Sequence, residues 1–236
     1  MTSWALARHR SLDTWLLQVF AKEVVEKGEF MSYSRFAIYY VPPEGPLADF
    51  GASWLGWDVS RGCEAPQRNI PGLDDITMTP RKYGFHATLK PPFGLADGQD
   101  LQALEATVSD LATGLAPATC GGLALTTLAG FLALAPQGDM QAVRRVAGAC
   151  VCELDRFRAP ASQAELARRR KVGLSPSQGA LLAQWGYPYV MEEFRFHMTL
   201  TARLPQGDLA VWSAVVRRHL PDLPGLFVLD QIALCG

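Results

Sequence analysis

Two short segments carry the residue types most able to do chemistry, and both contain the pattern His-x-Thr-Leu. In the first segment His86 is followed by Thr88, and in the second His197 is followed by Thr199. Apolar and polar side chains alternate along both segments, as they do in a β-strand with one buried face. Each histidine should therefore share the polar face of its strand with its threonine. Because imidazole accepts and donates protons near neutral pH, the repeated pattern predicts an acid-base site with two halves.

The remaining sequence predicts the strands and helices that position these two segments. Apolar alternation and turn residues predict strands, and apolar spacing of three to four residues predicts helices. The expected strands are 35–41, 83–90, 122–128, 131–135, 194–203 and 226–234. The expected helices are 47–57, 100–113, 139–154, 161–171, a short one from 175, and 209–220, with residues 58–80 expected as a loop near the site.

This order of elements favours an α+β fold, because strands and helices are mixed and the hairpin around Ala129-Gly130 implies antiparallel pairing. We predict a bilobal protein, with two pseudo-symmetric antiparallel-sheet lobes and flanking helices around a central cleft. Each lobe would contribute one His-x-Thr segment.

The first 31 residues differ from the rest and are predicted to be an N-terminal helical extension, with a helix through Leu12, Trp15, Leu16 and Val19. Residues 32–236 would then form a single bilobal domain. Met31 stands directly before the first strong strand, so it is an alternative translation start.

Composition sets outer limits on function. The chain has 236 residues, 49% of them hydrophobic, and a net charge of −1, which gives no overall attraction to nucleic acid or membranes. Five cysteines, mostly in apolar segments, do not resemble a disulfide framework, and a cytoplasmic location is expected. Arginine clusters at 144–145, 168–171 and 217–218 are best explained as solvated helix faces.

The two histidine segments together resemble the signature of the 2H phosphoesterase superfamily, whose members have two His-x-Thr/Ser motifs in two pseudo-symmetric lobes. The wider sequence resembles the branch of that superfamily encoded beside phosphonate-utilisation genes. The stretches that carry this resemblance are 35–40, 83–93, 185–190 and 194–201. The resemblance covers the chain from about Arg35 to its end.

The resemblance implies metal-independent phosphodiester chemistry without a cofactor. His86 and His197 would be the general acid and base, and Thr88 and Thr199 would donate hydrogen bonds to phosphate oxygens. Lys90 and Arg195 extend the same polar faces and are further candidates for phosphate binding. Tyr39, Tyr187, Tyr189 and Arg203 are candidates for the substrate pocket.

The predicted activity is hydrolysis of a small cyclic phosphate such as 5-phosphoribosyl 1,2-cyclic phosphate in phosphonate catabolism. One alternative is an RNA 2′,3′-cyclic phosphodiesterase or 2′-5′ RNA ligase-like enzyme, but long nucleic acid would require a basic groove. Another is a non-catalytic module that binds phosphate or nucleotide, although no Walker or dinucleotide fingerprint occurs. A zinc site is the third alternative, and no third protein ligand lies on either polar face.

Overall fold

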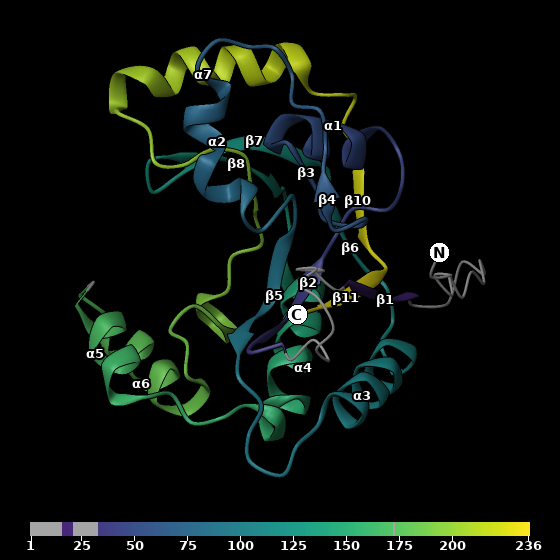
Figure 1. Ribbon diagram of the computed structural model, residues 1–236, viewed down its shortest axis with the longest axis vertical. Coiled ribbons are helices and arrows are strands. Elements are labelled where there is room, and N and C mark those ends of the chain that lie inside the picture. The colour runs from purple at the N-terminus through teal and green to yellow at the C-terminus, as the bar shows by residue number, and fades with distance from the viewer. Residues whose placement is uncertain (1–15, 21–32, 172) are drawn as a thin grey trace, which may run out of the picture.

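The structure is a computed structural model, and it describes residues 16–20, 33–171 and 173–236 (Figure 1). The predicted α+β class is confirmed, since helices and several small sheets alternate along the chain. Among the described residues, no helix combines the length and the apolar character that crossing a bilayer requires.

The largest sheet has four strands in the order β1-β11-β2-β5. Their bounds are Leu16–Phe20 for β1, Gln231–Cys235 for β11, Phe36–Tyr40 for β2 and Ala87–Phe93 for β5. β11 and β5 pair antiparallel with the two sides of β2, and β1 pairs parallel with β11. The sheet therefore joins the start of the described chain to its last strand, and it holds the segment after His86.

Three smaller antiparallel sheets complete the strands. One contains β7 (Leu123–Leu128), β8 (Phe131–Pro136) and β9 (Met198–Thr199). The others pair β6 (Ala118–Gly121) with β10 (Leu226–Leu229), and β3 (Trp57–Asp58) with β4 (Cys63–Glu64). The predicted hairpin is confirmed: Ala129 and Gly130 both have positive φ, as in a type I′ turn between β7 and β8.

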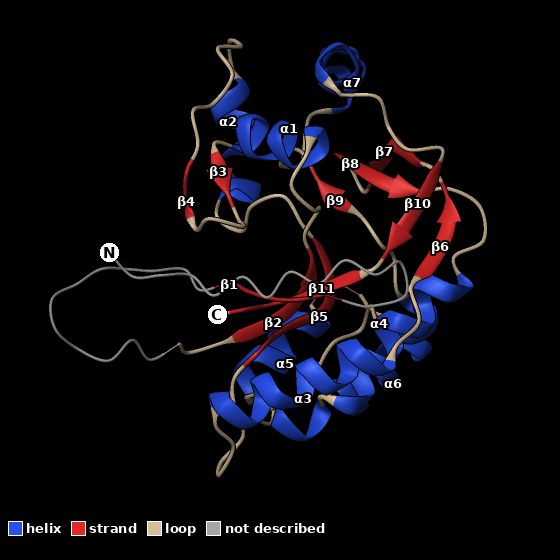
Figure 2. Cartoon of the chain, turned by 90° about the vertical axis from the view of Figure 1, so that its right-hand side faces the viewer, coloured by secondary structure: helices blue, strands red, loops and turns tan. Residues whose placement is uncertain are grey.

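The helices fall into two groups. Figure 2 shows α1 (Pro46–Leu55), α2 (Leu73–Arg81) and α7 (Gln206–His219) at one end of the molecule. At the other end are α3 (Leu101–Gly114), α4 (Gln141–Glu153), α5 (Gln163–Arg170) and α6 (Pro176–Trp185). Short 3₁₀ turns occupy Asp155–Phe157 and Met191–Glu193. The four-stranded sheet lies between the two groups (Figure 2).

One hydrophobic core connects the two ends of the molecule. It contains Trp54 and Phe50 of α1, Ile38 of β2 and Leu89 of β5, and it continues into Val143 of α4. All five side chains are at most 1% exposed. A division into two lobes stays a prediction, because this cluster of buried side chains runs through both groups of helices.

The N-terminal segment differs from its expected structure where it is described. Leu16–Phe20 forms strand β1 and not part of a helix, and the rest of the predicted 1–31 extension lies outside the described residues. A short apolar run is compatible with either structure. The open edge of β11 supplies the backbone partners that select a strand here.

The segment 58–80, expected as a loop, contains two short strands and helix α2. α2 begins after Gly72, whose φ of 77° lies in the left-handed region, and its first turn carries Asp74 and Asp75. Thr77 is fully buried and its hydroxyl donates to the carbonyl of Leu73 at 2.7 Å. Because α2 is mostly polar, apolar periodicity in the sequence does not predict it.

The second histidine segment forms only the two-residue strand β9, although a strand was expected over 194–203. Beyond Thr199 its backbone bonds to several different elements. Trp54 Nε1 of α1 donates to the carbonyl of Leu200 at 3.0 Å, and the amide of Ala202 donates to the carbonyl of Ile76 at 2.6 Å. The Thr201 hydroxyl accepts from the Leu132 amide at 3.0 Å. These contacts hold the segment extended without a regular ladder.

Candidate active site

His86 is fixed by the backbone just before β5. Its Nδ1 lies 3.0 Å from the carbonyl oxygen of Gly84. A carbonyl only accepts, so Nδ1 carries the proton and Nε2 is the unprotonated nitrogen of the neutral ring. The Thr88 hydroxyl, 3.3 Å from Nε2, donates to it. Gly84 has a φ of 75°, and a Cβ there would stand 2.6 Å from Cβ of Val59, so glycine is needed at this turn.

His197 is held in the same way just before β9. Its Nδ1 lies 2.8 Å from the carbonyl oxygen of Arg195, again the residue two positions earlier. The proton of the neutral ring therefore also sits on Nδ1, and Nε2 is the nitrogen that can exchange a proton with a ligand. The two histidines thus share both a sequence pattern and a tautomer set by the backbone.

A pocket of about 290 Å³ lies beside His86, and segments far apart in the sequence form its wall. Its lining residues come from α2 and the turn after it, from the start of β8 and from the segment after β9. They are Thr79, Pro80, Tyr83, Gly84, His86, Phe131, Thr199, Thr201, Ala202 and Arg203. We call this the histidine pocket.

His197 is not a lining residue of this pocket, but it contacts one of them. Its ring centroid is 5.7 Å from that of Phe131, which is a wall residue. The charge of His197, when present, lowers the pKa of His86, so the two imidazoles lie within electrostatic range. Tyr39 stacks on the His86 ring with centroids 3.8 Å apart.

The His86 ring is half-buried beside the pocket, and desolvation there favours its neutral form. This desolvation lowers the pKa of His86 to about 4, with the nearby His197 as a smaller cause, and the hydrogen bond to the Gly84 carbonyl acts in the opposite direction. At neutral pH His86 therefore presents an unprotonated Nε2 and can accept a proton. Burial also raises the pKa of the neighbouring Tyr39 phenol, which stays protonated.

Folding stability is expected to depend on pH through His86. Above about 6.5 the imidazole is neutral in both the folded and the unfolded chain, so the pKa difference has no effect there. As the pH falls from about 6.5 toward 4, the unfolded chain takes up a proton that the folded chain does not, and the free energy of unfolding decreases. Urea titrations between pH 7 and pH 4.5 should show a shallower decrease for His86→Gln than for the parent. Equal slopes would contradict the burial of a neutral imidazole.

Of the other predicted site residues, Thr199 and Arg203 line the histidine pocket, and Thr88 bonds to His86. Arg195 is exposed and does not line the pocket. Tyr187 and Tyr189 contact each other edge to face, with centroids 5.7 Å apart, and neither lines the pocket. The roles given to all these residues stay predictions.

Lys90 was expected beside His86 and Thr88, but it lies in a different place. Its side chain is 2% exposed and its Nζ donates to the carbonyl of Val151 in α4 at 3.1 Å. The pairing of β2 with β5 changes register, with Tyr39 opposite Thr88 but Ile38 opposite Lys90. This irregularity breaks the strict alternation of faces on which the expectation depended.

Sequence reasoning missed the apolar wall of the pocket, namely Pro80, Phe131 and Ala202. Phe131 offered one signal, since it opens the strand after the predicted hairpin turn. For metal binding, the described part of the chain contains no group of three or more His, Cys, Asp or Glu side chains able to hold an ion.

The fold and the pocket define an α+β protein with two histidines presented by separate sheets. Residues 88–236, more than half of the chain, match the model of a family described as "Protein of unknown function (DUF1045)". The chain belongs to this family. The match begins at Thr88, two residues after His86, and includes His197.

Two curated relatives carry a functional name. The chain is 39% identical over 186 residues to a protein of Janthinobacterium sp. (strain Marseille) named "Ribose 1,5-bisphosphate phosphokinase PhnN". The aligned residues make up 76% of this chain and 41% of that protein. It is 38% identical over 191 residues to a protein of the same name from Laribacter hongkongensis (strain HLHK9), over 78% of this chain and 44% of the relative. The chain thus spans less than half the length of either relative.

These names correct the predicted activity. A phosphokinase transfers a phosphoryl group, and the names do not describe a phosphodiesterase. The expected hydrolysis of a cyclic phosphate is therefore contradicted, and the RNA-processing and non-catalytic alternatives do not fit either. The names do support two coarser expectations: an enzyme, and a link with phosphonate-utilisation genes.

Proposed function

We propose that the chain is an enzyme of phosphonate metabolism that binds a phosphorylated ribose in the histidine pocket and exchanges protons with its oxygen atoms through His86 and His197. The observation that carries this proposal is the matched anchoring of the two imidazoles, each through Nδ1 to the carbonyl two residues earlier. The resemblance of both segments to 2H phosphoesterases supports treating the histidines as a pair.

The substrate class rests on the relatives, whose name specifies a ribose bisphosphate. A cavity of about 290 Å³ is near the lower end of the usual size for small-molecule sites and suits a pentose with one phosphate. Thr199 and Arg203 on its wall would donate hydrogen bonds to phosphate oxygens.

Phosphoryl transfer to or from a sugar requires a proton to move on or off a sugar oxygen. A neutral His86 would take that proton at Nε2. Bound phosphate places negative charge near the imidazole, and this raises the pKa of His86 toward the neutral range where acid-base catalysis is most effective.

The test is ³¹P NMR of ribose 5-phosphate and ribose 1,5-bisphosphate incubated with the chain, in separate samples with and without ATP and magnesium. We expect a new phosphorus resonance in at least one of these samples, and its loss in the His86→Ala and His197→Ala variants. Unchanged spectra in all samples would overturn the proposal, as would full turnover by either variant.

A further inference from the structure

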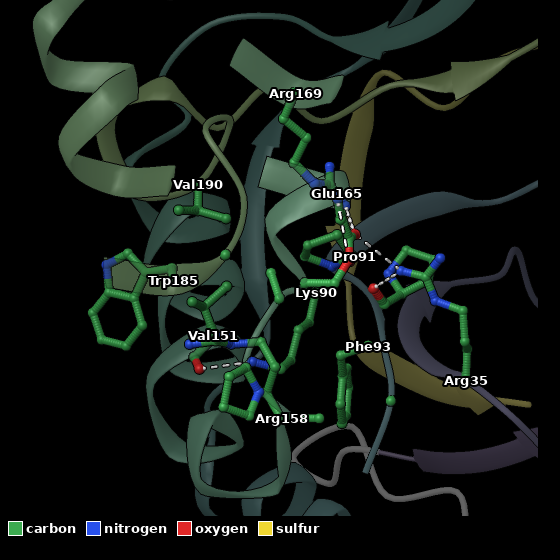
Figure 3. A pocket seen from close by; sticks show the side chains of 17 residues that line it. Arg35, Lys90, Pro91, Phe93, Val151, Arg158, Glu165, Arg169, Trp185 and Val190 are labelled. Carbon is green, nitrogen blue, oxygen red and sulfur yellow. Dashed lines mark hydrogen bonds and ion pairs between the residues drawn. The ribbon is translucent and has the colours of Figure 1, made fainter. Parts of the chain in front are cut away.

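A second pocket, of about 350 Å³, shares no lining residue with the histidine pocket and is lined by residues of β5, α4, α5 and the end of α6 (Figure 3). Its charged lining consists of Arg35 before β2, Lys90 of β5, Arg158, and Glu165 and Arg169 of α5. Trp185 and Val190 form part of its apolar wall. We call it the arginine pocket.

Positive charge exceeds negative charge around this cavity. Four cations line it, and two carboxylates contact those cations: Glu165, which is itself a lining residue, and Asp155. Four positive and two negative groups leave an excess of two positive charges. The chain as a whole carries −1, so this concentration of cations is local.

Lys90 is the most buried of the four cations. At 2% exposure, its ammonium has the Val151 carbonyl at 3.1 Å and Asp155 Oδ1 at 3.9 Å as partners. Burial, the largest cause, lowers the pKa of Lys90 to about 8, and Asp155 acts against that shift. An ammonium has three donors and one of them bonds to Val151, so an anion in the cavity would be a further acceptor for Lys90.

The guanidinium groups of Arg35 and Arg169 converge on one carboxylate oxygen. Glu165 Oε1 lies 2.7 Å from Nη2 of Arg169 and 3.5 Å from Nη2 of Arg35 (Figure 3). Nε of Arg169 is buried and has no hydrogen-bond partner among the described residues. Glu165 thus holds both arginines over the cavity while satisfying only part of their five donors each.

Arg158 is oriented by a carboxylate in a similar way. Its Nε and Nη2 donate to the two oxygens of Asp155, at 2.7 and 3.2 Å. The same Asp155 lies near Lys90, so one carboxylate positions two of the cations. Each pair of cations is therefore arranged by one acidic side chain, and the cavity is organised before a ligand arrives.

We propose that the arginine pocket is a second anion site, which binds a phosphate group through Lys90, Arg35 and Arg169. Arginine forks and a buried ammonium are the usual protein donors to phosphate oxygens, and the cavity has room for a sugar beyond the phosphate. The phosphate could be free or could be the ester end of a small sugar phosphate, and the experiment below separates the two.

The site is distinct from the histidine pocket. The two pockets have no lining residue in common, and Lys90 directs its ammonium to Val151 of α4 and to Asp155. The proposal therefore concerns a different set of donors and does not depend on the proposed function. Its failure would leave the chemistry of His86 and His197 untouched.

The test is isothermal titration calorimetry of the His86→Ala/His197→Ala double variant, in which the histidine pocket lacks its imidazoles. The titrants are inorganic phosphate, ribose 5-phosphate and ribose. We expect both phosphates to bind and ribose not to bind. Loss of one charge-assisted contact should weaken the affinity about tenfold to a hundredfold in Arg35→Gln and Arg169→Gln. Arg168→Gln, an exposed neighbour on the same helix, is the matched control and should bind as its parent does.

Arg35 is the deciding position if Arg169→Gln proves unstable, because its side chain is 47% exposed and its loss should leave the fold intact in a thermal melt. The comparison uses the binding that Arg35→Gln weakens, because Thr199 and Arg203 of the histidine pocket are still present in the double variant. If that binding is tighter for ribose 5-phosphate than for inorganic phosphate, the site takes an ester, and the reverse order assigns it to the free anion. No binding of either phosphate, or equal affinities in Arg35→Gln and its parent, would overturn the proposal.

Discussion

Replacing either His86 or His197 by alanine is expected to lower kcat by about 10²–10⁴, the usual contribution of general acid-base catalysis. Each imidazole is fixed through Nδ1, at 3.0 and 2.8 Å from its backbone partner, so Nε2 is the atom that alanine removes from the reaction. The measurement is the initial rate of phosphorus-containing product formation in the ³¹P assay that gives turnover. Arg218→Ala, at an exposed position on α7, is the control for the effect of substitution alone.

The double variant sharpens this expectation. Two residues that act on one reaction coordinate do not contribute independently, so His86→Ala/His197→Ala should be little slower than the worse single variant. A loss equal to the product of the two single losses would mean that the histidines act in separate steps. Circular dichroism should show that the variants remain folded, since neither imidazole belongs to the hydrophobic core.

Trp54→Ala is expected to cost about 3–5 kcal/mol of folding free energy. The Trp54 side chain is fully buried, stacks on Phe50 with ring centroids 5.6 Å apart, and lies in the core that joins the two ends of the molecule. Such a loss is a large part of the stability of an ordinary domain. Urea denaturation at pH 7.5 measures it.

Trp54→Phe separates packing from hydrogen bonding at this position. It keeps an aromatic ring but removes the N–H that bonds to the carbonyl of Leu200, and an unsatisfied buried carbonyl costs about 1–3 kcal/mol. Because Leu200 follows Thr199, this variant should also shift the amide NMR signal of Thr199. If Trp54→Phe were as stable as the parent and left that signal in place, the bond would have no role in holding the second histidine segment.

Local sequence patterns were sufficient to predict the turns, caps and buried positions that depend on adjacent residues. The type I′ turn at Ala129-Gly130 and the cap of α6 at Ser175, where Gln178 completes a capping box, follow from adjacent residues. The alternation around His86 likewise identified its buried neighbours, since Phe85, Ala87 and Leu89 are all at most 2% exposed.

Tertiary contacts decided what the sequence could not show. The register change between β2 and β5 moves Lys90 away from His86, and no residue pattern within the strand predicts this change. Arg169 was grouped with solvated arginines, yet it lines a cavity beside Glu165, whereas its neighbours Arg168 and Arg170 are exposed. The activity, finally, depends on what a pocket binds, and a two-histidine pattern is shared by more than one kind of chemistry.

The central position of β11 has a consequence for how the chain folds. Gln231 bonds to the carbonyl of Val41 across 190 residues, and β2 meets β11 over a similar separation. Closing so long a loop is entropically unfavourable and slow compared with forming the β7–β8 hairpin, whose strands are joined by two residues. The hairpin that carries Phe131 can therefore form early in folding, whereas the sheet that orders β5 beside His86 acquires its central strand only late. The histidine pocket combines Phe131 of this hairpin with His86 and with Thr199 to Arg203, so its wall is complete only after contacts between distant parts of the sequence have formed.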